Sequence, residues 1–191
     1  MDEKLDNGPK IKGVRRGQHS AIVIGSVQVF VGPENMAPYP VEAWAAEEDT
    51  YLVLSADPEV QAIEENPEQI MAEVSATHPA EPGSVIVKNG YPLRLLAIIH
   101  DLNQEPSWKE EWVASALDGI LQEMENREIR SLALPLLGTL HGSLERKRFL
   151  TLLREALERR QPIHLSRLWL VVPSGTTSDI LAMLEGELQK W

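Results

Sequence analysis

From residue 84 onward, short apolar runs alternate with longer segments of helical periodicity, and this alternation limits the fold more than any other feature of the chain. It predicts crossover connections and a parallel or mixed sheet flanked by helices, which is an α/β fold. Ligands bind to such sheets beyond the carboxyl ends of the strands, so we expect a site at the loop that follows Leu137. The expected strands are 84–88, 95–100, 132–137 and 168–172, and the expected helices are 112–124, 144–159 and 179–188.

Upstream of residue 84 the patterns are shorter. Two β-branched runs at 21–24 and 27–31 are broken by Gly25, which predicts two strands or one bulged strand. Further apolar pieces follow at 41–46 and 51–54. These pieces extend the expected sheet towards the N-terminus.

The chain of 191 residues is long enough for one hydrophobic core. Residues 1–19 combine charge and glycine without periodicity, so we expect a flexible N-terminal tail there. A single domain is expected over residues 20–191. Within it, Asp57 as N-cap and Pro58 at the first helical position predict the start of a helix.

Composition excludes several classes of protein. The chain has 18 Lys and Arg against 29 Asp and Glu, a net charge of -11, which argues against nucleic-acid binding because that binding neutralises phosphates. Its lack of cysteine excludes disulfides, zinc–thiolate sites and cysteine nucleophiles. Apolar runs are far shorter than the ~20 residues that span a bilayer, and the first residues do not resemble a signal peptide. We therefore expect a cytoplasmic protein that binds no membrane.

Acidic charge is concentrated in one segment. Residues 17–87 contain twelve Asp and Glu but no Lys or Arg. A solvated acidic face explains such a run in the simplest way. If the segment instead contributes to a pocket, that pocket repels anions.

The loop after Leu137 has the features of a phosphate-binding turn. Gly138 and Gly142 permit a ligand to approach the backbone, and free N–H groups at the start of a helix attract anions. Thr139, Leu140 and His141 lie between the two glycines. The alternative is a plain strand-to-helix turn in which Ser143 is the N-cap and takes those N–H groups.

Residue patterns for catalysis or metal binding are weak. His100 precedes Asp101, but adjacent residues on a strand point to opposite faces, so a structural histidine is the simpler interpretation. No histidine pair has the spacing of metal ligands, and the acidic clusters at 47–49 and 57–59 lack the pattern of a calcium loop. We expect no catalytic residues, no metal and no cofactor.

Several segments in order resemble macro domains. They are the glycine-led strand Gly83-Ser84-Val85-Ile86-Val87, the turn Gly90-Tyr91-Pro92-Leu93, the strand end Ile98-Ile99-His100, the helix of Trp112, and the strand and loop from Ile129 to Thr139. The resemblance covers roughly 83–173, and 27–32 and 41–49 resemble two earlier family strands. It implies a three-layer α/β/α domain with a mixed sheet.

The resemblance also implies a ligand and the residues beside it. Macro domains bind ADP-ribose and related metabolites, and some hydrolyse ADP-ribosyl bonds. The ligand-binding positions of the family fall at Gly32, Asp49 and Asp57 and at the loop from Gly138 to Ser143. The usual family residues are largely replaced, because Pro33 follows Gly32, Ala46 and Asp49 replace two asparagines, and Asp57 lies where a glycine-rich loop is usual.

These observations lead to one leading hypothesis and two alternatives. The leading hypothesis is a divergent, non-catalytic binding module for an ADP-ribose-like nucleotide or another phosphorylated small molecule. The first alternative is a degenerate domain that acts in protein–protein interaction or forms a homo-oligomer through its tryptophans. The second is a remnant of the macro-like N-terminal domain of leucine aminopeptidases.

Overall fold

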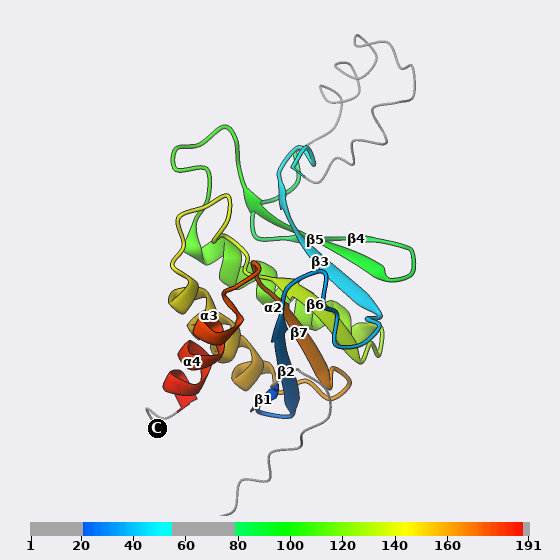
Figure 1. Cartoon of the computed structure of the whole chain (residues 1–191). Helices are drawn as coiled ribbons and strands as arrows, with labels where there is room; N and C mark the ends of the chain where they lie inside the picture. Colours follow the sequence, from blue (N-terminus) through cyan, green and yellow to red (C-terminus); the bar gives the residue numbers. More distant parts are fainter. Residues whose placement is uncertain (1–20, 55–78, 189–191) are drawn as a thin grey trace, which may run out of the picture.

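The computed structural model describes residues 21–54 and 79–188. Within these residues the chain forms one seven-stranded sheet in the order β1-β2-β7-β6-β3-β5-β4 (Figure 1). The five inner strands run parallel, while β1 and β4 pair antiparallel at the two edges. The strands are β1 (Ala21–Ile24), β2 (Val27–Gly32), β3 (Ala43–Asp49), β4 (Val85–Lys88), β5 (Leu93–His100), β6 (Ser131–Pro135) and β7 (Arg167–Val171).

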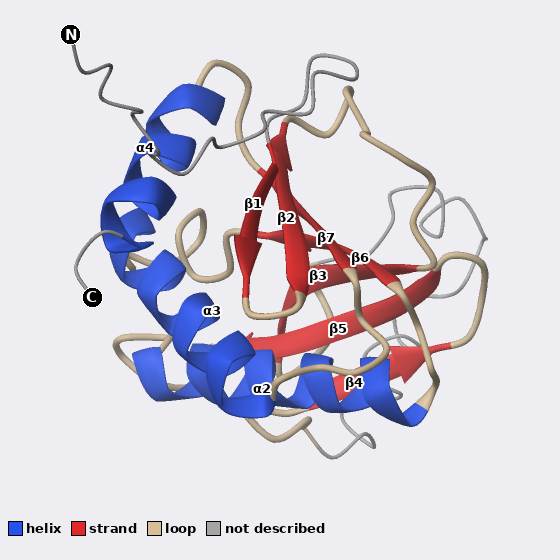
Figure 2. Cartoon of the chain, turned by 90° about the horizontal axis from the view of Figure 1, so that it is seen from below, coloured by secondary structure: helices blue, strands red, loops and turns tan. Residues whose placement is uncertain are grey.

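Three helices of the described residues cover one face of this sheet. They are α2 (Glu110–Asn126), α3 (Arg146–Arg160) and α4 (Thr177–Leu188), and Figure 2 shows them side by side along the same side of the strands. The α/β class and the mixed sheet predicted from the sequence are confirmed. The helix expected from Asp57 and the tail expected at 1–19 lie outside the described residues.

The main core lies between the sheet and these helices. Alternate residues of each strand enter it, as the side-chain period of two requires. The apolar face of α2 repeats at helical spacing and is buried against β5 and β4. The core residues of α2 are Val113, Ala116, Leu117, Ile120, Leu121 and Met124, and those of α3 are Phe149, Leu150, Leu152, Leu153, Ala156 and Leu157.

Aromatic side chains occupy the opposite face of the sheet. Trp169 of β7 points away from the helices, because its neighbours Leu168 and Leu170 are in the main core. Its ring meets Trp44 of β3 edge-to-face, with centroids 5.5 Å apart. Trp169 Nε1 donates to the carbonyl oxygen of Gly32 at 3.1 Å, so a buried indole N–H has its partner.

Two boundaries differ from the sequence prediction in ways that matter for the site. Helix α3 begins at Arg146, and its N-cap is Glu145, so the alternative in which Ser143 is the N-cap is wrong. The loop is longer because the N–H of Leu144 donates back to the carbonyl oxygen of Gly138 and closes a wide turn before the helix. Strand β3 also continues past Ala46 to Asp49, which brings three carboxylates to the end of the sheet.

No helix in the two described segments is long and apolar enough to cross a membrane.

Candidate functional site

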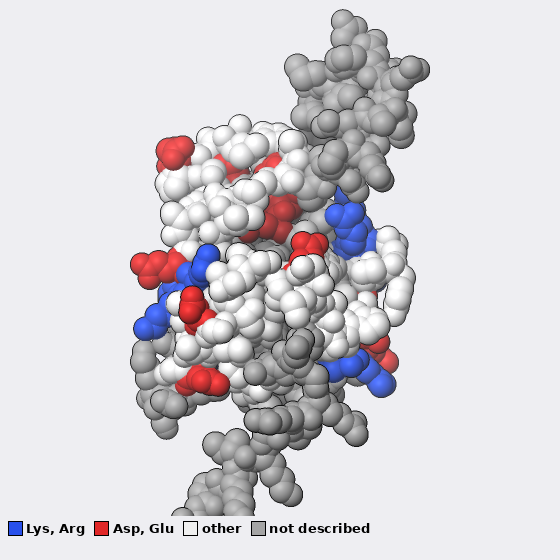
Figure 3. Space-filling view, viewed as in Figure 1, with Lys and Arg blue, Asp and Glu red and all other residues white. Residues whose placement is uncertain are grey.

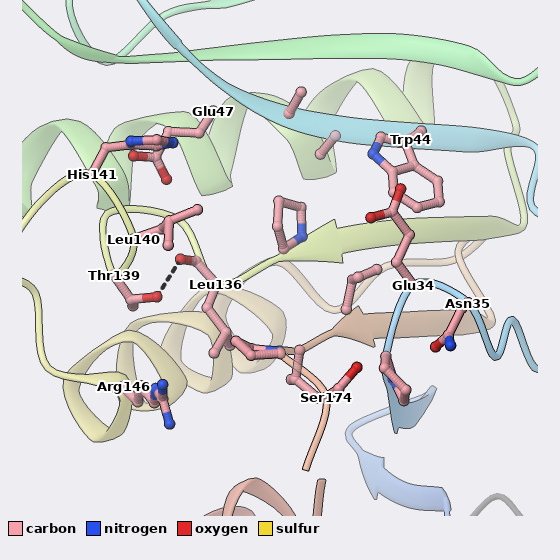
Figure 4. Close-up of a pocket in the computed structure, with 17 residues that line it drawn as sticks. Glu34, Asn35, Trp44, Glu47, Leu136, Thr139, Leu140, His141, Arg146 and Ser174 are labelled. Carbon is pink, nitrogen blue, oxygen red and sulfur yellow. Dashed lines mark hydrogen bonds between the residues drawn. The ribbon is translucent and has the colours of Figure 1, made fainter. Parts of the chain in front are cut away.

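A cleft of about 730 Å³ opens where four parallel strands end. Its walls come from the loops after β2, β6 and β7 and from residues 44–47 of β3 (Figure 4). Figure 3 shows acidic side chains at the middle of one face of the molecule. The lining residues are Pro33, Glu34, Asn35, Trp44, Ala45, Ala46, Glu47, Pro135, Leu136, Thr139, Leu140, His141, Arg146, Val171, Val172, Pro173 and Ser174.

The loop after β6 owes its shape to Gly138. This residue has φ of +75°, a backbone conformation that side chains disfavour, and an added Cβ would lie 3.1 Å from Val113 of α2. The turn is closed by Thr139, whose N–H and hydroxyl both donate to the carbonyl oxygen of Leu136, at 3.2 and 2.8 Å. The short tight turn then exposes the residues that follow it.

Four consecutive backbone amides in this loop lack protein acceptors. The N–H groups of Leu140, His141, Gly142 and Ser143 donate to no acceptor among the described residues. The next amide, of Leu144, is the one that donates to Gly138. A run of unpaired amides beside a cleft is a favourable place for an anion, because each N–H carries a partial positive charge.

Glu47 lies at the deep end of the same loop. Its Oε1 is 2.5 Å from Nε2 of His100, and its Oε2 accepts from the N–H of Gly138 at 2.9 Å. The side chains of His100 and Glu47 are only 2% and 10% exposed. One carboxylate therefore joins the ends of three strands, since Glu47 belongs to β3, His100 to β5, and Gly138 follows β6.

Two groups on the cleft wall can carry positive charge. The ring of His141 is nearly perpendicular to that of His100, with centroids 6.3 Å apart, and it lies on the exposed side of the loop. Arg146 extends from the first turn of α3, and no carboxylate within the described residues forms an ion pair with it. Figure 4 shows Glu47 and Arg146 on opposite sides of the Thr139–Leu140 segment.

The other two carboxylates at the end of β3 hold a turn together. Asp49 Oδ1 accepts from the N–H of Tyr51 at 2.6 Å, and its Oδ2 accepts from Val53 and Leu54 at 3.0 and 2.9 Å. Glu48 Oε1 accepts from Leu54 at 2.8 Å. Both side chains are fully buried, so these backbone bonds replace the water that an ionised carboxylate otherwise needs.

The structure brings together only part of the site predicted from the sequence. Thr139, Leu140 and His141 line the cleft, and Gly138 lies beneath it through its bond to Glu47. The other predicted residues lie apart from the lining or beyond the described segments. Gly142 packs against Trp108, Ser143 is exposed outside the cleft, Gly32 bonds to Trp169, Asp49 is buried in its own turn, and Asp57 lies outside the described residues.

Sequence reasoning missed the partner of His100. The carboxylate considered there was Asp101, but the structure pairs His100 with Glu47 instead. Both residues end parallel strands that are neighbours in the sheet, and this neighbourhood follows from strand order, which the alternation of elements leaves open. Glu34 and Arg146 were missed for a similar reason, because each is an ordinary charged residue until the strand ends converge.

Within the described residues, no group of three or more His, Asp or Glu is arranged to hold a metal ion.

Comparison with known proteins identifies the fold. No protein-family model matches the chain, and no curated protein matches it. Among solved structures, the Oceanobacillus iheyensis macrodomain with MES bound is 16% identical, with a TM-score of 0.66 over 91% of this chain and 99% of that one. The same macrodomain with ADP is 15% identical, with a TM-score of 0.65 over 91% and 97%.

A second macrodomain supports the same conclusion. The macrodomain of Thermus aquaticus DarG is 22% identical, with a TM-score of 0.54 over 76% of this chain and 98% of that one. The chain therefore has the macrodomain fold, at low sequence identity. The fold that the resemblance to macro domains implies is confirmed.

Proposed function

We propose that this protein is a non-catalytic binding module whose cleft holds a nucleotide-type or otherwise phosphorylated small molecule. The observation that carries the proposal is the run of four unpaired amides, from Leu140 to Ser143, at the edge of a cleft in a macrodomain fold. A phosphate oxygen is the acceptor best suited to such a run. A solved structure of the same fold holds ADP, which supports this ligand class.

The cleft has the size of a small-molecule site. Its volume of about 730 Å³ falls within the ~300–1,000 Å³ that ligand pockets usually have. Trp44 supplies an aromatic surface to the cleft, and Ala45 and Ala46 leave space beside it. An aromatic ring or a ribose fits such a wall, while the loop after β6 takes the charged group.

Two carboxylates in the cleft limit the affinity that we expect. Glu34 and Glu47 both line it, against Arg146 and the imidazole of His141. Like charges near 4 Å apart repel by about 4 kcal/mol at an effective dielectric of ~20, and hydration reduces this figure. We therefore expect weaker binding of ADP-ribose than an all-neutral cleft of this shape would give.

The cleft residues also lead us to expect no turnover. Ala46 carries no polar group, and both oxygens of Glu47 are already hydrogen-bonded. A catalytic site needs groups held against the reacting atoms, and such positioning accounts for a large part of enzymatic rate. Incubation with an ADP-ribosylated peptide followed by NMR is expected to release no free ADP-ribose.

Calorimetric titration tests the binding proposal. Full-length protein is titrated at low salt with ADP-ribose, ADP and inorganic phosphate. A matched pair of variants places any binding in the cleft: Ala46→Phe fills the lining, whereas Val23→Phe enlarges an exposed residue of the edge strand β1. Binding that is lost in Ala46→Phe and kept in Val23→Phe supports the proposal.

The absence of heat with all three ligands would contradict it. The assembly alternative then gains support, and the mass of the protein in solution decides whether it forms the homo-oligomer of that alternative. We further propose that residues 20–191 form one module, with 1–19 as a tail.

A further inference from the structure

The cleft has opposite charges on the two sides of its phosphate-type loop. Glu47 lies on one side, and Arg146 lies on the other (Figure 4). Both residues line the cleft, so a ligand that reaches one side meets a carboxylate and a ligand that reaches the other meets a guanidinium. This distribution of charge affects whether a bound ligand can have one phosphate group or two.

The carboxylate of Glu47 is fixed in place. One oxygen is bonded to His100 and the other to the N–H of Gly138, and the side chain is only 10% exposed. To turn away, it would have to break both bonds. His100 is buried behind it and does not line the cleft, so Glu47 is the member of the pair that a ligand meets.

Glu47 also removes one donor from the loop. The N–H of Gly138 lies within the turn that Thr139 closes, and the protein's own carboxylate accepts from it at 2.9 Å. An incoming phosphate on this side meets a negative charge and finds that amide already bonded. The deep end of the loop is thus occupied by an internal anion.

The outer side of the loop has the opposite character. Arg146 is exposed, and within the described segments it pairs with no carboxylate. Leu140 and His141 also line the cleft, and their backbone amides donate to no described acceptor. One guanidinium and two amides suffice to bind a single phosphate group, because the guanidinium presents a fork that matches two phosphate oxygens.

We propose that the cleft selects phosphomonoesters over diphosphates. A terminal monophosphate of a nucleoside or sugar binds at Arg146 and the amides of Leu140 and His141, while Glu47 repels the second phosphate of a diphosphate chain. This inference rests on the proposed function and narrows its ligand class. It makes Glu47 a specificity-determining residue that acts by repulsion, which is one of the two ways in which a site distinguishes ligands.

Titration of AMP and ADP against four forms of the full-length protein tests the inference. The forms are wild type, Glu47→Gln, Arg146→Ala and Lys147→Ala. Lys147 is exposed, lies next to Arg146 and does not line the cleft, so its variant controls for the loss of one surface charge. Glutamine keeps an oxygen acceptor for Gly138 while removing the negative charge.

The expected results separate the two sides of the loop. Wild type binds AMP at least about fivefold more tightly than ADP, and Glu47→Gln raises the affinity for ADP about tenfold while changing that for AMP less than about threefold. Arg146→Ala weakens both ligands about tenfold or more, and Lys147→Ala changes neither beyond about twofold. Thermal melts show whether each variant is folded.

Contrary outcomes fall into two kinds. Equal or tighter binding of ADP in wild type, or an equal gain for both ligands in Glu47→Gln, overturns the selection for monophosphates and leaves the proposed function standing. If Glu47→Gln does not fold, the inference is tested by two other results: the preference of wild type for AMP over ADP, and the loss of affinity in Arg146→Ala. Failure of both ligands to bind wild type overturns the proposed function together with this inference.

Discussion

Two loops at the same end of the sheet differ in whether their backbone amides have acceptors within the protein. In the loop after β3, the carboxylates of Glu48 and Asp49 accept from the amides of Tyr51, Val53 and Leu54. In the loop after β6, the amides from Leu140 to Ser143 donate to no described acceptor. The first loop is closed by anions that belong to the chain, and the second is left open to an anion from outside.

Glu47 lies between these two arrangements. It follows the pattern of the first loop, since it accepts from a backbone amide, but that amide is Gly138 of the second loop. Three successive carboxylates at the end of β3 therefore accept from backbone amides of their own protein. A carboxylate that lines the cleft is here part of the scaffold.

Asp49→Ala is expected to break the first loop and to have the largest effect. The change removes one side chain that accepts from three amides and is fully buried. We expect a loss of about 3–4 kcal/mol in the free energy of unfolding, because a hydrogen bond to a charged group contributes about 1.5–3 kcal/mol and the loss is reduced where Leu54 keeps Glu48 as an acceptor and Val53 is exposed to water. Urea unfolding measures it, with Glu185→Gln on the exposed surface of α4 as the control. A loss below about 1 kcal/mol would show that water replaces the carboxylate.

Glu47→Ala is expected to have the next largest effect. It leaves His100 buried without its carboxylate and the amide of Gly138 without its acceptor. We expect a loss of about 2–3 kcal/mol on urea unfolding, whereas Glu47→Gln, which keeps an acceptor oxygen, loses about 1 kcal/mol. The two variants together separate the hydrogen bonds of Glu47 from its charge. Equal losses in both would assign the stabilisation to the charge alone.

Gly138→Ala tests the shape of the second loop. The residue has φ of +75°, and the added Cβ would press on Val113 at 3.1 Å. Gly175→Ala is the matched control, since Gly175 has φ of +83° but nothing within 4 Å of the added Cβ. We expect about 1 kcal/mol of lost unfolding free energy at Gly175 from the backbone alone and about 2 kcal/mol at Gly138, where crowding adds to it. Similar losses would mean that Val113 gives way without cost.

The sequence predicted the α/β fold and the position of the loop after Leu137, but it did not predict the charged contacts of the site. The spacing of apolar residues in Trp112–Met124 and in the run before His100 identified α2 and β5, because burial on one face depends mainly on local periodicity. The position of the loop after Leu137 followed from the general rule for parallel sheets. These predictions needed no knowledge of strand order.

The partners of Glu47 depend on which strands are neighbours. Glu47 is 53 residues from His100 and 91 residues from Gly138 in the sequence. Only the strand order β6-β3-β5 brings the three residues together. The alternative with an N-cap at Ser143 was wrong for a different reason. The hydrogen bond from the N–H of Leu144 to Gly138 widens the turn, and no single residue of the sequence indicates that bond. Local pattern thus gives the elements, and long-range pairing gives the chemistry.

The smallest expected effect concerns Glu125, another carboxylate that accepts from backbone amides, in the last turn of α2. Burial alone would raise the pKa of Glu125, but the amides of Ile163, His164 and Leu165 and the ring of His164 lower it overall. A carboxyl whose folded pKa lies below its unfolded value stabilises the protein above the unfolded pKa, near 4.5, and loses that contribution as pH falls through the folded pKa. Urea unfolding of wild type and Glu125→Gln at pH 7 and at progressively lower pH is expected to show a difference of less than about 1 kcal/mol, largest at pH 7 and shrinking below pH ~4.5. A difference that stays constant with pH would mean that Glu125 acts through its shape, so that a neutral amide at this position fails for lack of a second acceptor oxygen and not for lack of charge.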